Sequence, residues 1–170
     1  NGVTIRWTPV ADGQTLTGDP ARQIRQGQFH RVPVIWGSNH DEARLFVAGE
    51  YHQVNRWFVT RADVDAYITR IAGDDADLAR KLTNTYTFWR YGTLDKAFSA
   101  MLTDYYFSCG AMRDAQALSR YVPTFHYEFT EPDTPAPVDP LMSLGAFHGA
   151  ELAYLFQNNL IVTTPLPPLN

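Results

Sequence analysis

A short apolar segment that ends in a glycine constrains the fold of this chain most. Residues 31–37, RVPVIWG, form a β-branched and aromatic run closed by Gly37. Such a run is typical of a strand buried in a parallel sheet. Pro33 has no N–H to donate to a neighbouring strand, so it must lie near the start of this one. We therefore predict a buried strand over this segment.

Helical periodicity follows between about residues 41 and 121. Four apolar side chains of segment 63–71 recur at spacings that place them on one helix face: Val64, Tyr67, Ile68 and Ile71. Asp74 or Asp75 is suited to cap the helix that comes next. Segments 93–107 and 113–121 continue the pattern, and Pro123 ends it. The middle of the chain is therefore predicted to be helical.

A second strand is predicted at residues 124–130, where large apolar side chains alternate with polar ones. His126 falls on the polar face, and we interpret it as a strand residue rather than a catalyst. The next ten residues, 131–140, contain four prolines and should be irregular. A strand, several helices and a strand define an α/β fold. Two strands are too few to cover helices this apolar, so we expect missing partners.

Composition limits the classes of function. The chain has 170 residues, one domain's worth, with a net charge of −4 and a pI near 5.7. These values argue against nucleic acid as a partner. No apolar run reaches the roughly 18–20 residues that a membrane span needs, and the first residues, NGVTI, do not resemble a signal peptide. The absence of an initial Met suggests that the chain begins inside a longer protein. The single cysteine, Cys109, is expected to be a buried thiol.

The first candidate for chemistry is the segment GSNHDE at residues 37–42. It follows the predicted buried strand, and sites form at the carboxyl ends of parallel strands because loops converge there. Asp41 and Glu42 are therefore placed for chemistry. The alternative is that the two carboxylates only open a helix, one as its cap and one complementing its dipole.

The second candidate is the segment GAFHGAEL at residues 145–152. His148 is flanked by Gly145 and Gly149, and a tight backbone of this kind can present an imidazole as a general base. A structural or solvated histidine is the alternative. Glu151 can cap the helix that continues through Phe156.

The sequence lacks the motifs of metal sites, cofactor sites and a serine nucleophile. His40, Asp41 and Glu42 are too close in sequence to bind one ion together, and neither H-x-x-x-H nor C-x-x-C occurs, so we predict no metal. There is no glycine-rich phosphate loop and no G-x-G-x-x-G, so no cofactor is predicted either. The nucleophile elbow G-x-S-x-G is absent as well; Ser38 lies in WGSNH, which is not that motif.

Four segments together resemble the type-B carboxylesterase (cholinesterase-like) family of α/β hydrolases. Residues 8–13 (TPVADG) are similar to its P-V-x-D-G stretch, and residues 32–42 (VPVIWGSNHDE) to its V-P-[VIL]-x-x-G-x-N-x-D-E segment. Residues 125–129 (FHYEF) resemble the strand before the catalytic histidine. Residues 145–152 are similar to the signature G-A-x-H-G-x-[ED]-L. The order and spacing of these segments are more specific than any one of them.

The resemblance implies that Glu42 is the acid and His148 the base of a Ser-His-Glu triad, with Asp41 structural. It also implies that residues 1–170 are one partial α/β-hydrolase domain. The serine nucleophile, the oxyanion loop and the other main strands are then expected before Asn1, and further helix and strand after the end. One departure is Ala43, where the family usually has a glycine.

The implied function is carboxylic ester hydrolysis by the complete protein, with a small-molecule ester as substrate, while this chain alone is expected to be inactive. Aromatic side chains between residues 51 and 107 either line a substrate pocket or pack in the core: Trp57, Phe58, Tyr67, Phe88, Trp89 and Tyr91. Exposed apolar surface should drive association with the rest of the protein or with itself. A catalytically inactive cholinesterase-like binding domain and a stand-alone helical module are alternatives. The residues do not indicate a cellular compartment.

Overall fold

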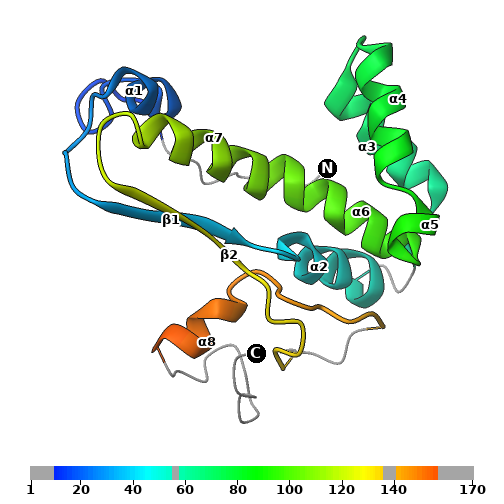
Figure 1. Cartoon of the computed structure of the whole chain (residues 1–170). Coiled ribbons are helices and arrows are strands. Elements are labelled where there is room, and N and C mark those ends of the chain that lie inside the picture. Colours follow the sequence, from blue (N-terminus) through cyan, green and yellow to red (C-terminus); the bar gives the residue numbers. More distant parts are fainter. Residues whose placement is uncertain (1–9, 55–57, 136–140, 157–170) are drawn as a thin grey trace.

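The computed structural model of the chain describes residues 10–54, 58–135 and 141–156. In chain order its elements are α1 (Pro20–Gln26), β1 (Val34–Asn39), α2 (Glu42–Val47), the π-helix η1 (Ala48–Val54), α3 (Arg61–Ala72), α4 (Ala76–Thr85), α5 (Phe88–Tyr91), α6 (Leu94–Thr103), the π-helix η2 (Asp104–Ser108), α7 (Cys109–Leu118), β2 (Thr124–Phe129) and α8 (Ala150–Phe156). Figure 1 shows the helices arranged around a narrow two-stranded ribbon. The predicted α/β class is confirmed.

The two predicted strands pair with each other in parallel. Val34 is opposite Thr124 and Asn39 is opposite Phe129. The observed strand begins directly after Pro33, as the missing N–H requires. The backbone N–H of His40 donates to the carbonyl of Phe129 at 2.9 Å, so the pairing continues to the point where α2 begins. The carboxyl ends of both strands therefore lie side by side.

Local capping explains where the middle helices begin. Thr60 forms a capping box with Asp63 at the start of α3, and the side chain of Asp75 caps α4. Thr93 accepts from the backbone of Lys96 and begins α6. From there α6, η2 and α7 run on as one long helical rod, with η2 as a π segment in the middle (Figure 1). The predicted helices are confirmed, including the inward face of α3.

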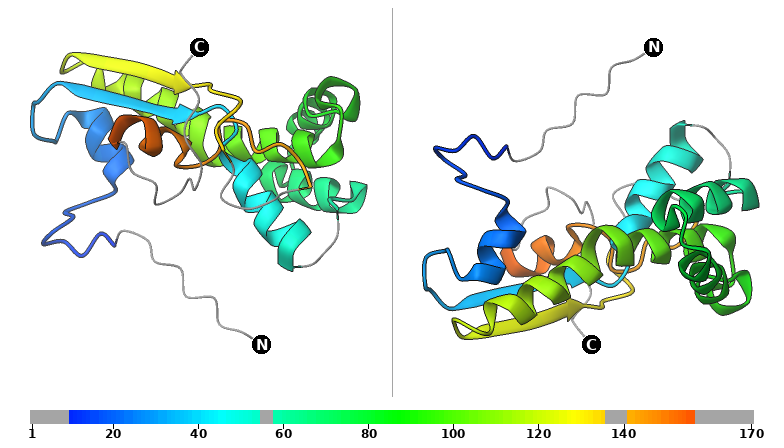
Figure 2. Two further views of the ribbon diagram at one scale, coloured as in Figure 1. Left: turned by 90° about the horizontal axis from the view of Figure 1, so that it is seen from below. Right: turned by 90° about the horizontal axis from the view of Figure 1, so that it is seen from above.

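The two faces of the sheet are covered unequally. The α7 end of the long rod lies along one face, and the short α8 lies on the other side of the strands (Figures 1 and 2). Ile35 and its register partner Phe125 are 74% and 64% exposed. The prediction that residues 31–37 are buried is therefore wrong for this chain. A sheet of two strands offers too few neighbours, and within the described residues α8 and the segment before it approach the second face near the ends of the strands.

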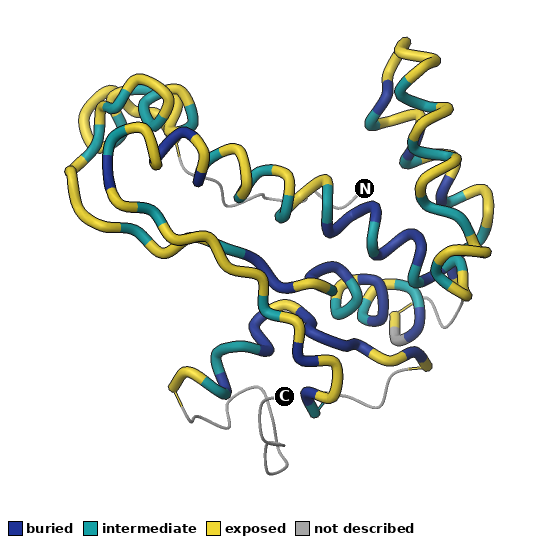
Figure 3. Tube along the Cα trace, viewed as in Figure 1, coloured by how far each residue is buried: buried dark blue, intermediate teal, exposed yellow. Residues whose placement is uncertain are grey.

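Burial concentrates where α2, α6 and the segment before α8 meet (Figure 3). Val47, Phe98, Met101 and Phe147 are among the most buried side chains of this cluster. The hydroxyl of Thr103 accepts from the backbone N–H of Ala43 at 3.0 Å, which joins the start of α2 to the end of α6. The core of the chain is thus built directly beneath the end of β1.

Cys109 is exposed, so the prediction of a buried thiol is also wrong. It lies beside a hollow of about 550 Å³ between α4 and the long rod, lined by apolar side chains such as Leu82 and Met112. Because that hollow is open, the face of the rod that carries Cys109 is not covered. None of the helices in the described ranges is long and apolar enough to cross a membrane.

Candidate active site

Glu42 opens α2 three residues after Asn39, the last residue of β1. Asp41 occupies the N-cap position, but its side chain makes no capping hydrogen bond. The two carboxylates therefore open a helix, as the alternative expected, although the side chain of Asp41 does not cap it. Glu42 is 6% exposed, which is unusual for a residue whose only task is to complement a helix dipole at a surface.

His148 approaches Glu42 from the segment that precedes α8. Its Nδ1 lies 2.6 Å from Oε2 of Glu42, although the two residues are 106 positions apart. The glycines on either side of this turn, Gly145 and Gly149, have positive φ angles of 57° and 82°, which L side chains rarely adopt. The backbone thereby turns tightly and brings the imidazole back over the start of α2. The structure joins the two predicted site residues in one hydrogen bond.

The two partners differ in exposure. The side chain of Glu42 is 8% exposed, whereas that of His148 is 50% exposed. Within the described residues His148 has no hydrogen-bond partner other than Glu42, so its Nε2 is available to a further group. The rings of Phe46 and Phe107 stack on each other with centroids 6.1 Å apart, and both lie near the imidazole, at 5.1 and 5.4 Å. An acid buried on one side and an open ring nitrogen on the other suit a group that must transfer a proton.

The hydrogen bond to Glu42 raises the pKa of His148 above its ordinary value. Partial burial opposes this effect, and the negative charges of Glu42 and Glu151 add to it. The same two carboxylates also raise the pKa of Tyr127, after a larger contribution from burial. The region therefore carries a negative potential that stabilises an imidazolium.

Asp41 and Arg44 fix the segment that leads to His148. One carboxylate oxygen of Asp41 accepts from the backbone N–H of Ala146 at 3.1 Å, and the other pairs with Arg44 at 2.8 Å. Arg44 also donates to the carbonyl of Ser143 at 3.2 Å. Gly145 packs so closely against Asp41 that a Cβ there would collide with the carboxylate. These contacts agree with the structural role expected for Asp41.

The remaining candidates lie elsewhere. His126 is an exposed residue of β2, in agreement with its interpretation as a strand residue. Among the aromatic side chains suggested for a pocket wall, Tyr67 packs on Phe98 in the core, while Trp89 is 91% exposed. Trp57 lies outside the described residues. The ring contacts of His148 are instead with Phe46 and Phe107, which no spacing pattern in the sequence indicated.

Among the residues that the structure describes, no group of three or more His, Cys, Asp or Glu side chains is arranged to hold a metal ion. The hollow beside β1 and η2, of about 480 Å³, is lined by mixed polar groups that include His40, Asp104 and Glu128. It lies on the α7 side of the sheet, where Ser38 and Ser108 share a hydrogen bond of 3.2 Å.

An acid and a histidine that follow two adjacent parallel strands define part of an α/β-hydrolase fold. A solved structure named PNB esterase superposes with a TM-score of 0.61 at 27% identity, covering 93% of this chain and 30% of that one. The model of the carboxylesterase family matches residues 1–167, and the chain belongs to this family. The recognised resemblance and the partial α/β-hydrolase fold are thereby confirmed.

Individual relatives carry different names. The chain is 29% identical to acetylcholinesterase 1 of Caenorhabditis briggsae over 168 residues, which is 88% of this chain and 27% of that protein. It is 28% identical to para-nitrobenzyl esterase of Bacillus subtilis over 152 residues, again 88% and 27%. Neuroligin-3 of Mus musculus is 27% identical over 176 residues, 98% of this chain and 21% of that protein. The chain spans about a quarter of the length of the curated relatives it matches.

Proposed function

We propose that this chain supplies the acid and the base for carboxylic ester hydrolysis in a longer protein. Glu42 is the acid and His148 the base of a Ser-His-Glu triad. The observation that carries the proposal is the 2.6 Å hydrogen bond between a buried carboxylate and a half-exposed imidazole at the carboxyl ends of two parallel strands. The names of several relatives, acetylcholinesterase and para-nitrobenzyl esterase, agree with an ester as substrate.

In the proposed reaction a serine hydroxyl attacks the ester carbonyl. Nε2 of His148 takes the hydroxyl proton and later gives it to the leaving alcohol. Glu42 accepts from Nδ1–H, which keeps Nε2 unprotonated in the resting state, and it stabilises the imidazolium that forms. Water then hydrolyses the acyl-enzyme with His148 again as base. Backbone N–H groups outside this chain hold the oxyanion.

The serine is proposed to come from outside residues 1–170. The sequence contains no G-x-S-x-G, and α/β hydrolases place nucleophile, acid and histidine in that chain order. The nucleophile is then expected on a segment that precedes Asn1. The relatives are about four times longer than the matched region, so they have room for such a segment.

We further propose that residues 1–170 are part of one α/β-hydrolase domain and that the exposed apolar sheet face marks where it is incomplete. Ile35 and Phe125 lie side by side on that face and are mostly exposed. Contiguous apolar surface of this kind favours association. The partner is the remainder of the same protein, or a second copy of the chain when the remainder is missing.

Fluorophosphonate labelling read by intact mass tests the source of the nucleophile. The chain of 170 residues should form no adduct, whereas the longer protein that carries it should form one adduct per molecule. The same longer protein with His148→Ala is the matched control and should label much more slowly. A stoichiometric adduct on the 170-residue chain would show that one of its own serines is activated: Ser38, Ser99, Ser108, Ser119 or Ser143.

The raised pKa of His148 predicts the pH dependence of the longer enzyme. Only the neutral imidazole acts as base, so kcat/KM should rise with pH and reach half its maximum above roughly 6.5, the ordinary histidine value. Replacing Glu42 with Gln removes the main cause of the shift, so the midpoint should move to lower pH. A pH–rate profile of both enzymes gives the answer. An unchanged midpoint in the Glu42→Gln enzyme would show that the protonation of His148 does not control kcat/KM.

A catalytically inactive binding domain is the second candidate. Neuroligin-3, which aligns with 98% of the chain, has a name that states no enzymatic activity. The labelling experiment separates the two functions, because an inactive domain would leave the longer protein unlabelled even with Glu42 and His148 in place. A G-x-S-x-G in the sequence of the longer protein would favour the enzyme.

A further inference from the structure

Asn39 is the last residue of β1 and is 2% exposed. It makes three hydrogen bonds, each to a different part of the candidate site. Its backbone N–H donates to Oε1 of Glu42 at 2.9 Å. Its side-chain Nδ2 donates to the carbonyl of Phe147 at 2.7 Å and to the carboxylate of Glu151. One buried residue therefore contacts the acid and also the segment that carries the base.

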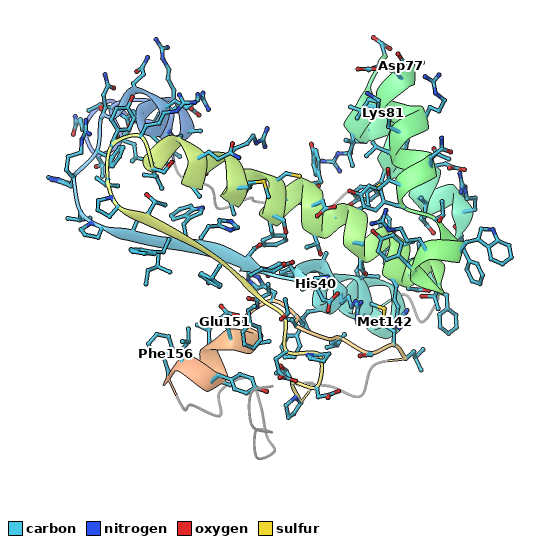
Figure 4. All side chains as sticks on the ribbon, viewed as in Figure 1. His40, Asp77, Lys81, Met142, Glu151 and Phe156 are labelled. Atoms are coloured by element: carbon cyan, nitrogen blue, oxygen red, sulfur yellow. The ribbon has the colours of Figure 1, made fainter. Side chains whose placement is uncertain are left out.

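The two side-chain bonds fix the backbone next to His148. The carbonyl of Phe147 belongs to the peptide bond that enters His148, and it also accepts from the N–H of Ala150 at the start of α8. Glu151 lies in the first turn of the same helix, at the end opposite Phe156 (Figure 4). An amide with two N–H groups satisfies both acceptors at once. The bonds therefore hold the turn before His148 and the helix after it against the end of β1.

The side chain must be an amide to do this. An aspartate at position 39 has no proton to donate and would place a carboxylate beside those of Glu42 and Glu151. A leucine has a similar volume but leaves the acceptors of Phe147 and Glu151 without their donor. Glu42 would keep its bond from the backbone N–H of residue 39 in either case, because any residue except proline supplies it. The side chain of Asn39 thus affects the position of His148 rather than that of Glu42.

We infer that Asn39 is a positioning residue that holds His148 in register with Glu42. The inference rests on the proposed function. Asn39 is 2% exposed, so it offers little surface to an ester; it acts through the Phe147 peptide, whose position determines where the imidazole lies. A misplacement of about 1 Å in a reacting group can reduce a rate roughly a hundredfold. The consequence of losing the amide is therefore expected in kcat rather than in KM.

The test uses the longer protein that carries this chain, with p-nitrophenyl acetate as the probe ester. Asn39→Leu should lower kcat roughly ten- to a hundredfold and change KM less than about twofold. The acidic limb of its kcat/KM profile should shift to lower pH, because a looser bond to Glu42 raises the pKa of His148 less. Glu42 and Glu151 are the charged groups that act on His148 here. Ser38→Ala, which affects the neighbouring residue on the α7 side, is the matched control and should leave kcat and the profile unchanged.

A second variant separates positioning from stability. Asn39→Leu leaves the carboxylate of Glu151 without its donor, and Glu151→Gln removes that charge. The double variant N39L/E151Q should regain part of the Tm that N39L loses, yet its kcat should stay roughly ten- to a hundredfold below that of E151Q alone. The inference is overturned if kcat recovers together with Tm in the double variant. It is also overturned if folded N39L keeps the acidic limb of its kcat/KM profile at the same pH as the unmodified enzyme. In either case Asn39 has only a structural role.

The variant E42Q distinguishes this outcome from failure of the proposed function. A strong loss of activity in E42Q with an unchanged kcat in N39L would keep the proposed function and reject the inference. Full activity in E42Q would reject both, because there would be no pair for Asn39 to position.

Discussion

Replacing His148 with alanine in the longer enzyme will lower kcat/KM by about four to six orders of magnitude. In the proposed mechanism the imidazole takes the serine proton, and its removal also leaves Glu42 with nothing to orient. The side chain is half exposed and makes its one hydrogen bond, within the described residues, to Glu42. The Tm should fall somewhat, because Oε2 of the buried Glu42 loses its donor, and steady-state kinetics of the folded protein on a chromogenic ester measures the effect on catalysis.

His126→Ala is the matched control for this substitution. His126 is an exposed histidine on β2, and it faces the α7 side of the sheet with its register partner Trp36. Its removal should leave kcat/KM close to that of the unmodified enzyme. If the folded His148→Ala protein keeps nearly full activity, His148 is not the general base.

Replacing Glu42 with glutamine will lower kcat by about 10⁴-fold. Glu42 uses one oxygen for the backbone N–H of Asn39 and the other for Nδ1 of His148. A glutamine has one oxygen and one NH₂, so it cannot accept both bonds. If its oxygen stays with Asn39, its NH₂ faces Nδ1, and the ring proton is forced onto Nε2, where it blocks the base.

Glu128→Gln supplies the control for the loss of a carboxylate. Glu128 is exposed on β2, and its removal lowers the negative charge of the chain by the same amount as the change at Glu42. Single-turnover acylation rates for both variants separate the chemical step from product release. Equal rates for E42Q and E128Q would remove Glu42 from the mechanism.

Elements whose causes are local could be predicted from the sequence. The helix starts at Thr60, Asp75 and Thr93 follow from side chains that cap the next residues, and the position of Pro33 limits the start of β1. The π segment η2 within the long rod was not predicted. The exposure of Ile35 was not predicted either, since burial depends on neighbours that a single segment cannot specify.

The geometry of the candidate site could not be predicted from local sequence patterns either. Glu42 and His148 were named through a resemblance, while the residue spacing alone left a helix cap and a solvated histidine as alternatives. Their contact, and the contrast between a buried acid and an open base, depends on the pairing of strands that are far apart in the sequence. The bonds of Asn39 and the rings of Phe46 and Phe107 also need that pairing, so no local pattern could indicate them.

The parallel pairing of β1 and β2 separates the part of the chain that holds Glu42 against His148 from the part that shapes the surroundings. Glu42 follows the end of β1 by three residues and His148 follows the end of β2 by 19, and the pairing of Asn39 with Phe129 places the two strand ends side by side. The helices from α3 to α5 form an excursion between these strands, and α3 and α4 project from the body of the molecule (Figure 1). Residues can be gained or lost at the turn around Gly73 without moving either strand. The shape of the surroundings can thus change while the contact between Glu42 and His148 is kept.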